Sequence, residues 1–256
     1  MPRILFFIVS KLVASIMCSI MRNRGLIIQE NVTSIVKRLD AAAKRTGRSS
    51  REITLVAVTK NVTVEDIRSA LNAGITALGE NRVQEAKPKF AQIGPTVAWH
   101  FLGHLQTNKA RIAAAIFDVI QSVDSLRVAK ALNQEAERFD RQVDVLVEVN
   151  ISGEESKFGL APQQLEALLP ELQEQKSLRL RGLMSLAPMV AEPERTRPFF
   201  RELARWFRHF QGRMGSAWDT LSMGMTNDFE VAIEEGATLV RIGTGIFHTP
   251  ELRRAA

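Results

Sequence analysis

The sequence predicts an α/β protein folded as a single (β/α)8 TIM barrel. Short apolar runs rich in Val and Ile alternate with helical patterns along the chain. Eight such units fit into about 220 residues, a length that suits one barrel. Polar residues follow nearly every apolar run, as expected where strands end at a functional face. A doubly wound sheet is the alternative, but the G-x-G-x-x-G signature of its dinucleotide-binding form does not follow the first strand.

The predicted strands are short and regularly spaced. In chain order they cover residues 53–58, 75–79, 97–103, 117–122, 143–150, 178–184, 219–223 and 238–243. Helical patterns lie between them, and the clearest cover residues 31–46, 125–138, 195–213, a segment starting at Pro162 and a segment from Asn227 to Gly236.

Capping and breaking residues refine several helices. Thr63 is typical of a residue that caps the start of a helix, and Gly74 of one that ends it. Asn227 and Glu230 have the spacing of a capping box. Pro88 and Pro170 fall inside helical patterns, where we expect breaks because proline lacks the amide hydrogen that a helix needs.

Composition excludes several classes of protein. The chain has 256 residues, 45% of them hydrophobic and 24% charged, which argues against a disordered chain or a many-pass membrane protein. Cys18 is its one cysteine, so an intrachain disulfide and a cysteine-rich zinc site are excluded. The net charge of +6 comes without a block of five consecutive basic residues, so nucleic acid is not the expected partner. A basic RNA- or membrane-binding module is the alternative that charge alone leaves open.

The N-terminal segment differs from the rest. Residues 4–20 are apolar except for Lys11 and three serines. This run is short for a membrane span, carries a charge at its centre and is followed by no small-residue cleavage site. We therefore predict that residues 1–28 form an extension, disordered or partly helical, outside the fold, and that residues 29–256 form the barrel.

Lys60 is the most informative residue at a strand end. It follows the first strand, where we expect it to be partly buried at the barrel mouth. Desolvation favours the neutral amine, and a neutral amine forms a Schiff base with an aldehyde. The alternative is a lysine that only extends into solvent.

Strands seven and eight end in residues suited to an anion. Ser222 and Gly224 share one strand face, and Arg241 and Gly243 share another. The two glycines allow backbone amides to approach an anion closely, and Thr244 adds a hydroxyl. A phosphate site is expected here in a barrel of this type. The alternative is two tight turns with small residues for packing.

An aldehyde-binding lysine and a phosphate site in one barrel suit pyridoxal 5′-phosphate (PLP). Arg241 facing the pyridine nitrogen can only donate a hydrogen bond, which keeps that nitrogen unprotonated and the ring a weak electron acceptor. The alternative for Arg241 is an ion pair with Glu148 or another acid. His100 and His104 lie on a strand-like run without a zinc-helix motif, so we predict no metal site and expect polar residues at the barrel mouth.

The motifs resemble a known family. They are VAVTK at 56–60, GENRVQEA at 79–86, WHFLGHLQTNK at 99–109, VNISGEESKFGL at 149–160 and LSMGMTNDFEVAIEEGATLVRIGTGIF at 221–247. Over about residues 30–248 the chain is similar to the pyridoxal phosphate homeostasis proteins. The resemblance implies a fold like the alanine racemase N-terminal domain, with PLP on Lys60, Asn81 near the ring hydroxyl and Arg241 at the ring nitrogen. It also implies that the phosphate is held by Ser222, Gly224, Gly243 and Thr244.

The resemblance further implies a cytoplasmic, monomeric PLP carrier in vitamin B6 homeostasis and supply, with no catalytic residue. PLP-dependent apoenzymes are the implied recipients, and no stable membrane association is expected. The alternative is a PLP-dependent racemase or lyase of weak activity. Alanine racemase takes a tyrosine base from an additional domain, and this sequence contains no tyrosine, so His100 or His104 would have to serve as the base. His248 stands where the family more often has glycine.

Overall fold

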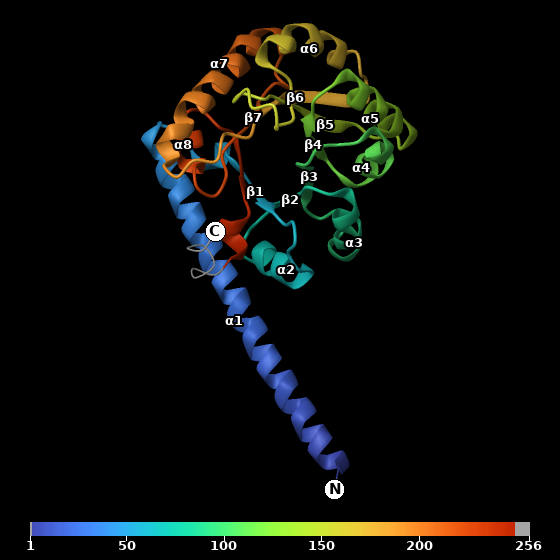
Figure 1. The fold of residues 1–256 in the computed structure, drawn as a ribbon, viewed down its shortest axis with the longest axis vertical. Coiled ribbons are helices and arrows are strands. Elements are labelled where there is room, and N and C mark those ends of the chain that lie inside the picture. Colours follow the sequence, from blue (N-terminus) through green and yellow to red (C-terminus); the bar gives the residue numbers. More distant parts are fainter. Residues whose placement is uncertain (1, 249–256) are drawn as a thin grey trace.

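The computed structural model describes residues 2–248, with the backbone alone for residues 2–22. Eight parallel strands of this part close into a barrel in sequence order, with β1 beside β8 (Figure 1). They are β1 (Thr54–Val58), β2 (Ala77–Glu80), β3 (Ala98–Phe101), β4 (Val119–Val123), β5 (Val143–Glu148), β6 (Leu178–Met184), β7 (Thr220–Ser222) and β8 (Leu239–Ile242). The predicted barrel is confirmed, and each predicted strand overlaps an observed one.

Helices surround the barrel and alternate with its strands. They are α1 (Pro2–Arg45), α2 (Val64–Asn72), α3 (Val83–Ile93), α4 (Ala110–Ile116), α5 (Leu126–Arg138), α6 (Leu165–Gln173), α7 (Arg197–Met214), α8 (Phe229–Glu234) and α9 (Thr244–Phe247). Single 3-10 turns lie at Ser50–Glu52, Thr107–Lys109, Pro162–Gln164 and Pro193–Thr196. The predicted start and end of α2 are confirmed. The Thr63 hydroxyl accepts a hydrogen bond from the Asp66 amide at the start, and Gly74 follows the helix with a φ of 98°.

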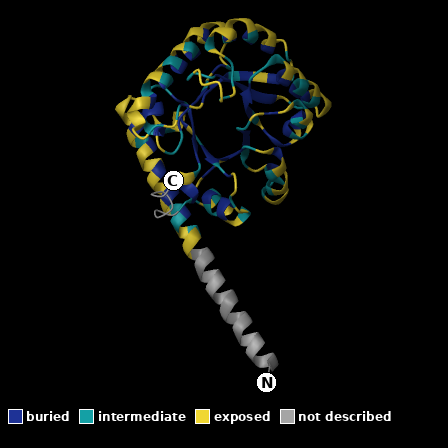
Figure 2. Cartoon of the chain, viewed as in Figure 1, coloured by how far each residue is buried: buried dark blue, intermediate teal, exposed yellow. Residues whose placement is uncertain are grey.

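The main core lies between the sheet and the helices. Figure 2 shows buried strands and helices that are buried inward and exposed outward. Trp99, Phe101, Phe117 and Trp218 are among the largest side chains that this layer buries completely or nearly so. The inside of the barrel is different, because buried polar side chains such as Gln121 and Arg241 sit there among a small apolar cluster. Polar chemistry is therefore concentrated in the barrel interior and at its ends.

Helix α1 closes the ring of helices. Its buried residues Ile28, Val32, Ile35 and Leu39 recur every three or four positions and form one apolar stripe. The stripe packs beside α2, α8 and α9 (Figure 1). Because α9 after β8 has only four residues, α1 occupies the outer position that a longer eighth helix would fill.

The packed part of the chain begins before residue 29. The Arg24 guanidinium pairs with the buried Asp66 at 2.8 Å, and Ile28 is 1% exposed. The boundary between residues 28 and 29 stays a prediction, and this packing argues for an earlier one. The apolar run at 4–20 lies where no side chains are described, and residues 249–256 lie outside the described part. Within the described residues, no helix has the length and apolar character needed to cross a membrane.

Deleting residues 1–28 should therefore destabilise the protein more than deleting residues 1–22. The longer deletion removes Ile28, and loss of a buried isoleucine side chain costs about 2–5 kcal/mol. We expect the melting temperature to fall by about 5 °C or more between the two deletions, measured by calorimetry. Ile28→Ala in the full chain should reproduce most of the effect, and Val36→Ala, on the exposed face of α1, should not. Equal melting temperatures for the two deletions would contradict this packing.

Three local predictions are wrong. Pro88 and Pro170 do not break α3 and α6, because each lies on an exposed face where water can hydrate the backbone carbonyl that loses its partner. The capping box at Asn227 and Glu230 does not form, since α8 begins at Phe229 and Asp228 precedes it. The Asp228 carboxylate instead accepts a hydrogen bond from the Met225 amide at 2.6 Å, and this bond closes the turn before α8.

Candidate functional site at the carboxyl ends of the strands

Lys60 lies in a tight turn directly after β1. The Val62 amide donates to the Thr59 carbonyl at 3.0 Å, and Asn61 takes a left-handed φ of 58°. Lys60 is exposed in this turn, rather than partly buried as the sequence predicted. Its amine is accessible to a ligand at the barrel mouth.

A buried ion pair supports the turn that carries Lys60. The Lys89 ammonium donates to Glu80 Oε1 and to the Thr59 carbonyl, each at 2.7 Å, and the Thr59 hydroxyl donates to the same carboxylate. Glu80 is completely buried, and its Oε2 has no hydrogen-bond partner among the described residues. These contacts tie the end of β1 to β2 and α3, which fixes the start of the Lys60 turn.

Asn81 follows β2 at the same end of the barrel. A side chain at Gly103 would place its Cβ 2.1 Å from the Asn81 carbonyl oxygen, so only glycine lets the segment after β3 lie against Asn81. Asn81 lines a pocket of about 520 Å³ together with Arg82, His104 and Lys109. Lys60, Ser222 and Arg241 are not among the residues that line this pocket.

Ser222 and Arg241 meet inside the barrel. The Arg241 guanidinium donates through Nη1 to the Ser222 hydroxyl and through Nη2 to the Ser185 carbonyl at 2.8 Å. Arg241 is 3% exposed, and this burial lowers the pKa of its guanidinium to about 10, against the opposing effect of the Asp228 and Glu148 charges. Among the described residues Arg241 has no carboxylate within ion-pair distance, so the alternative pairing with Glu148 is not formed.

Backbone amides after β7 and β8 are available to an anion. Within the described residues, the N–H groups of Gly224, Gly243 and Thr244 donate no hydrogen bond. Gly224 has a φ of 91°, and a Cβ on it would lie 2.5 Å from the Ala232 side chain, so this loop requires glycine. The Thr244 hydroxyl is exposed and bonded to Thr226 at 3.0 Å. Unpaired amides beside a buried cation form a suitable cradle for a phosphate.

The Lys60 turn and this cradle lie on adjacent strand ends. Strand β1 pairs with β8 in a register that places Ala57 beside Ile242. A methyl group placed on Gly243 would lie 3.4 Å from the Val58 carbonyl oxygen, two residues before Lys60. The structure therefore brings the predicted lysine and the predicted phosphate residues to one part of the mouth.

Acidic groups occupy another part of the mouth. Glu148 ends β5, and its burial raises the pKa of its carboxyl to about 7, with Asp124 raising it further and Arg241 opposing both. The His104 imidazole contacts Asp124 through Nδ1 at 3.0 Å and stacks on Phe158, with ring centroids 4.0 Å apart. The His104 imidazole lines the same pocket as Asn81.

Replacing Glu148 with glutamine should change how stability depends on pH. The folded-state pKa of about 7 lies above the usual 4.5, so the folded protein retains the Glu148 carboxyl proton to a higher pH than the unfolded chain does. The contribution of Glu148 to stability is complete below pH 4.5 and is lost as the pH rises through 7. As the pH rises from 4 to 9, the free energy of unfolding of Glu148→Gln should increase by about 3 kcal/mol relative to that of the parent. Denaturant unfolding measures this difference. Glu137→Gln on the exposed face of α5 controls for the loss of one charge. A difference that stays constant with pH would contradict the burial of Glu148.

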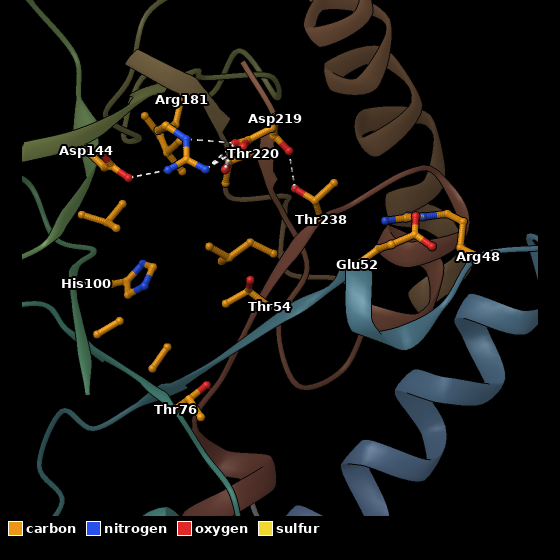
Figure 3. A pocket seen from close by; sticks show the side chains of 15 residues that line it. Arg48, Glu52, Thr54, Thr76, His100, Asp144, Arg181, Asp219, Thr220 and Thr238 are labelled. Atoms are coloured by element: carbon orange, nitrogen blue, oxygen red, sulfur yellow. Dashed lines mark hydrogen bonds and ion pairs between the residues drawn. The ribbon is translucent and has the colours of Figure 1, made fainter. Parts of the chain in front are cut away.

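His100 lies at the opposite side of the barrel interior from the predicted mouth. It lines a cavity of about 570 Å³ at the amino-terminal ends of the strands, together with Thr54, Thr76, Asp144 and Arg181 (Figure 3). The expectation that His100 is a mouth residue available as a base is therefore wrong, because its position within β3 turns it toward this cavity. His104 alone of the two lies at the mouth. The described residues contain no group of three or more His, Cys, Asp or Glu side chains arranged to hold a metal ion.

Sequence reasoning missed several residues of the site. Gln121 on β4 contacts Ser222 from across the barrel, the Ser185 carbonyl after β6 accepts from Arg241, and Lys89 supports the Lys60 turn. A signal existed for Gln121, because a glutamine inside an apolar strand needs a buried partner. No local pattern marks Lys89, whose partners come from two other elements.

Comparison with known proteins identifies the family of the barrel. The model of the alanine racemase N-terminal domain family matches residues 31–250. The pyridoxal phosphate homeostasis protein of Escherichia coli (strain K12) is 41% identical over 224 residues, which cover 86% of this chain and 95% of that protein. PipY of Synechococcus elongatus PCC7942, solved with PLP bound, has a TM-score of 0.71 and 36% identity, covering 83% of this chain and 99% of its own.

The closed barrel and the family match together define a protein of the alanine racemase N-terminal domain class. An alanine racemase of Clostridium difficile 630 shares the fold with a TM-score of 0.63 at 16% identity, covering 86% of this chain and 57% of that one. The chain belongs to the pyridoxal phosphate homeostasis protein family, as its resemblance in sequence predicted.

Proposed function

We propose that this protein binds PLP as a Schiff base with Lys60 and takes part in intracellular PLP homeostasis and supply. The observation that carries the proposal is the placement of the Lys60 turn beside the free amides of Gly243 and Thr244, on paired strands β1 and β8. PLP has an aldehyde and a phosphate, and these two groups need a lysine and an anion cradle a short distance apart. A PLP-bound structure of a relative at 36% identity supports the same ligand.

The other predicted residues take roles that suit their surroundings. Gly224, Gly243 and Thr244 hold the phosphate, Asn81 lies near the ring hydroxyl, and Arg241 faces the pyridine nitrogen. Ser222, predicted from the sequence as a phosphate residue, already gives its hydroxyl hydrogen to Gln121 and accepts from Arg241, so its role is to hold the arginine in place. The buried Arg241 keeps its proton, since the pKa of about 10 stays well above neutral pH. Arg241 donates a hydrogen bond to the ring nitrogen but does not transfer a proton to it, so the ring stays a weak electron acceptor. Such a ring suits a protein that holds PLP without using it for catalysis.

Lys60 is a better partner for the aldehyde than the neighbouring Lys89. The Lys89 amine is committed to Glu80 and to the Thr59 carbonyl, and its side chain is 12% exposed. Lys60 is exposed at the mouth and forms no hydrogen bond or ion pair with another described residue. Moving Lys89 to the aldehyde would also leave the buried Glu80 carboxylate without its cation, which is electrostatically costly.

Borohydride reduction tests this assignment directly. The purified protein is mixed with PLP, its visible absorbance is recorded before and after borohydride, and the modified peptide is identified by mass spectrometry. We expect the reduced adduct on Lys60. An adduct on Lys89 or another lysine, with Lys60 unmodified, contradicts the assignment, and no adduct at all contradicts the proposed function.

A second candidate function is weak PLP-dependent racemase or lyase activity. It is favoured by one observation, the His104 imidazole that contacts Asp124 and lines the same pocket as Asn81, because an imidazole at the mouth is suited to accept a proton. Racemisation of added amino acids by the parent, lost in His104→Phe, would support it. We propose that the carrier role is the main one, in a monomeric, cytoplasmic protein that delivers PLP to PLP-dependent apoenzymes.

A further inference from the structure

Four buried side chains form a continuous hydrogen-bond network across the barrel interior. Arg241 on β8 donates to Ser222 on β7, the Ser222 hydroxyl donates to Gln121 Oε1 at 2.6 Å, and Gln121 Nε2 lies 2.9 Å from His100 Nδ1. All four are at most 5% exposed. We call this set, Arg241, Ser222, Gln121 and His100, the core network.

The chemistry of arginine, together with the Gln121 amide oxygen that faces Ser222, gives the direction of each bond in the core network. A guanidinium only donates, so the Ser222 oxygen accepts from Arg241 and its one hydrogen goes to the Gln121 carbonyl oxygen. The amide NH2 of Gln121 then faces His100, and His100 Nδ1 must accept. His100 is therefore neutral, with its hydrogen on Nε2. Burial acts in the same sense and lowers the pKa of His100 to about 4, against the opposing charge of Asp144.

The core network ends at the cavity opposite the predicted PLP site. His100 lines the cavity at the amino-terminal ends of the strands, between Thr76 on one side and Asp144 on the other (Figure 3). Asp144 is held by Arg179 and Arg181 at 2.6 and 2.5 Å, so its carboxylate is already neutralised. The core network thus connects His100, at the amino-terminal end of the barrel, to Arg241, which we propose to face the pyridine nitrogen of PLP.

We propose that Gln121 and His100 are positioning residues for PLP, which act through Ser222 to hold Arg241 in its binding orientation from inside the barrel. This inference rests on the proposed function. Without an acceptor at His100, the Gln121 amide is free to turn and present its NH2 to Ser222. The Ser222 oxygen then faces two donors, its own hydrogen loses its acceptor, and Arg241 loses its fixed place.

Paired substitutions at His100 separate positioning from packing. The amide oxygen of asparagine can take the place of the acceptor Nδ1, so His100→Asn keeps the core network, while His100→Leu removes the acceptor. We expect His100→Leu to weaken PLP binding about five- to tenfold and to shift the visible absorbance band, and His100→Asn to stay within about twofold of the parent. Thr76→Val, in the same cavity but outside the core network, should leave both readouts unchanged.

Nuclear magnetic resonance of the PLP-free protein tests the direction of the bonds. With nitrogen-15 in the histidines, His100 should show an unprotonated Nδ1 and a protonated Nε2. Gln121→Glu offers His100 only acceptor oxygens, so it should move a proton onto Nδ1, while Ser222 keeps an acceptor. A protonated Nδ1 in the parent would overturn the core network.

The outcomes are distinguishable from failure of the proposed function. If the parent forms the Lys60 adduct but His100→Leu binds PLP as tightly as the parent, the positioning role alone is wrong. The same holds if His100→Asn is no better than His100→Leu. A parent that forms no adduct on Lys60 overturns the proposed function and this inference with it.

Discussion

Lys60→Ala should lose the visible absorbance of the PLP Schiff base completely, while some PLP binding persists. The covalent link depends on one amine, and Lys89, the neighbouring lysine, is committed to Glu80 and Thr59. The residues after β7 and β8 that we propose for the phosphate are separate from Lys60 and should retain weak binding. The measurements are absorbance spectra with PLP and equilibrium dialysis of the same samples.

Two further variants sharpen this result. Lys60→Arg keeps a positive charge at the mouth but forms no Schiff base, so it should lose the absorbance and retain more PLP than Lys60→Ala. Lys87→Ala, on an exposed position of α3, should behave like the parent. Persistence of the full absorbance in Lys60→Ala would show that a different amine holds the aldehyde.

The barrel was predictable because its signals are local and repeated. The strands are short, mostly apolar runs followed by polar residues, and β6 spans the predicted residues 178–184. The start of α2 was predictable for the same reason, since Thr63 caps a helix that begins one residue later. A periodic pattern over eight units tolerates errors of a residue or two at each boundary.

The failures come from tertiary context. The exposure of Lys60 depends on a turn at Asn61 and on the Lys89 and Glu80 pair, which join three elements. The position of His100 depends on which residues of β3 point inward, and sequence alternation alone did not say to which end of the barrel. The core network needs partners from four strands, and no pattern within one strand reports them.

Arg241→Glu should weaken PLP binding and destabilise the protein, more strongly as the pH rises. The substitution removes the buried cation that opposes the raised pKa values of Glu148 and Asp228, and it adds a third acid beside them. The buried Ser222 hydroxyl and Ser185 carbonyl also lose their donor, and each buried group left unsatisfied costs about 1–3 kcal/mol. Arg241→Gln provides a neutral second variant, because its amide can still donate to the Ser185 carbonyl. Thermal unfolding between pH 5 and pH 8 measures this part of the prediction.

The same variant should also make bound PLP more reactive toward amino acids. A glutamate facing the pyridine nitrogen can accept a hydrogen bond from a protonated ring, and a protonated ring withdraws electrons more strongly. We therefore expect a shifted absorbance band and faster exchange of the α-proton of alanine, followed by NMR in heavy water with PLP present. Arg241→Gln should bind PLP without this gain in exchange. If Arg241→Glu retains PLP and neither its spectrum nor its exchange rate differs from the parent, Arg241 does not face the ring. Its role is then structural, holding Ser222 and Ser185 together inside the barrel.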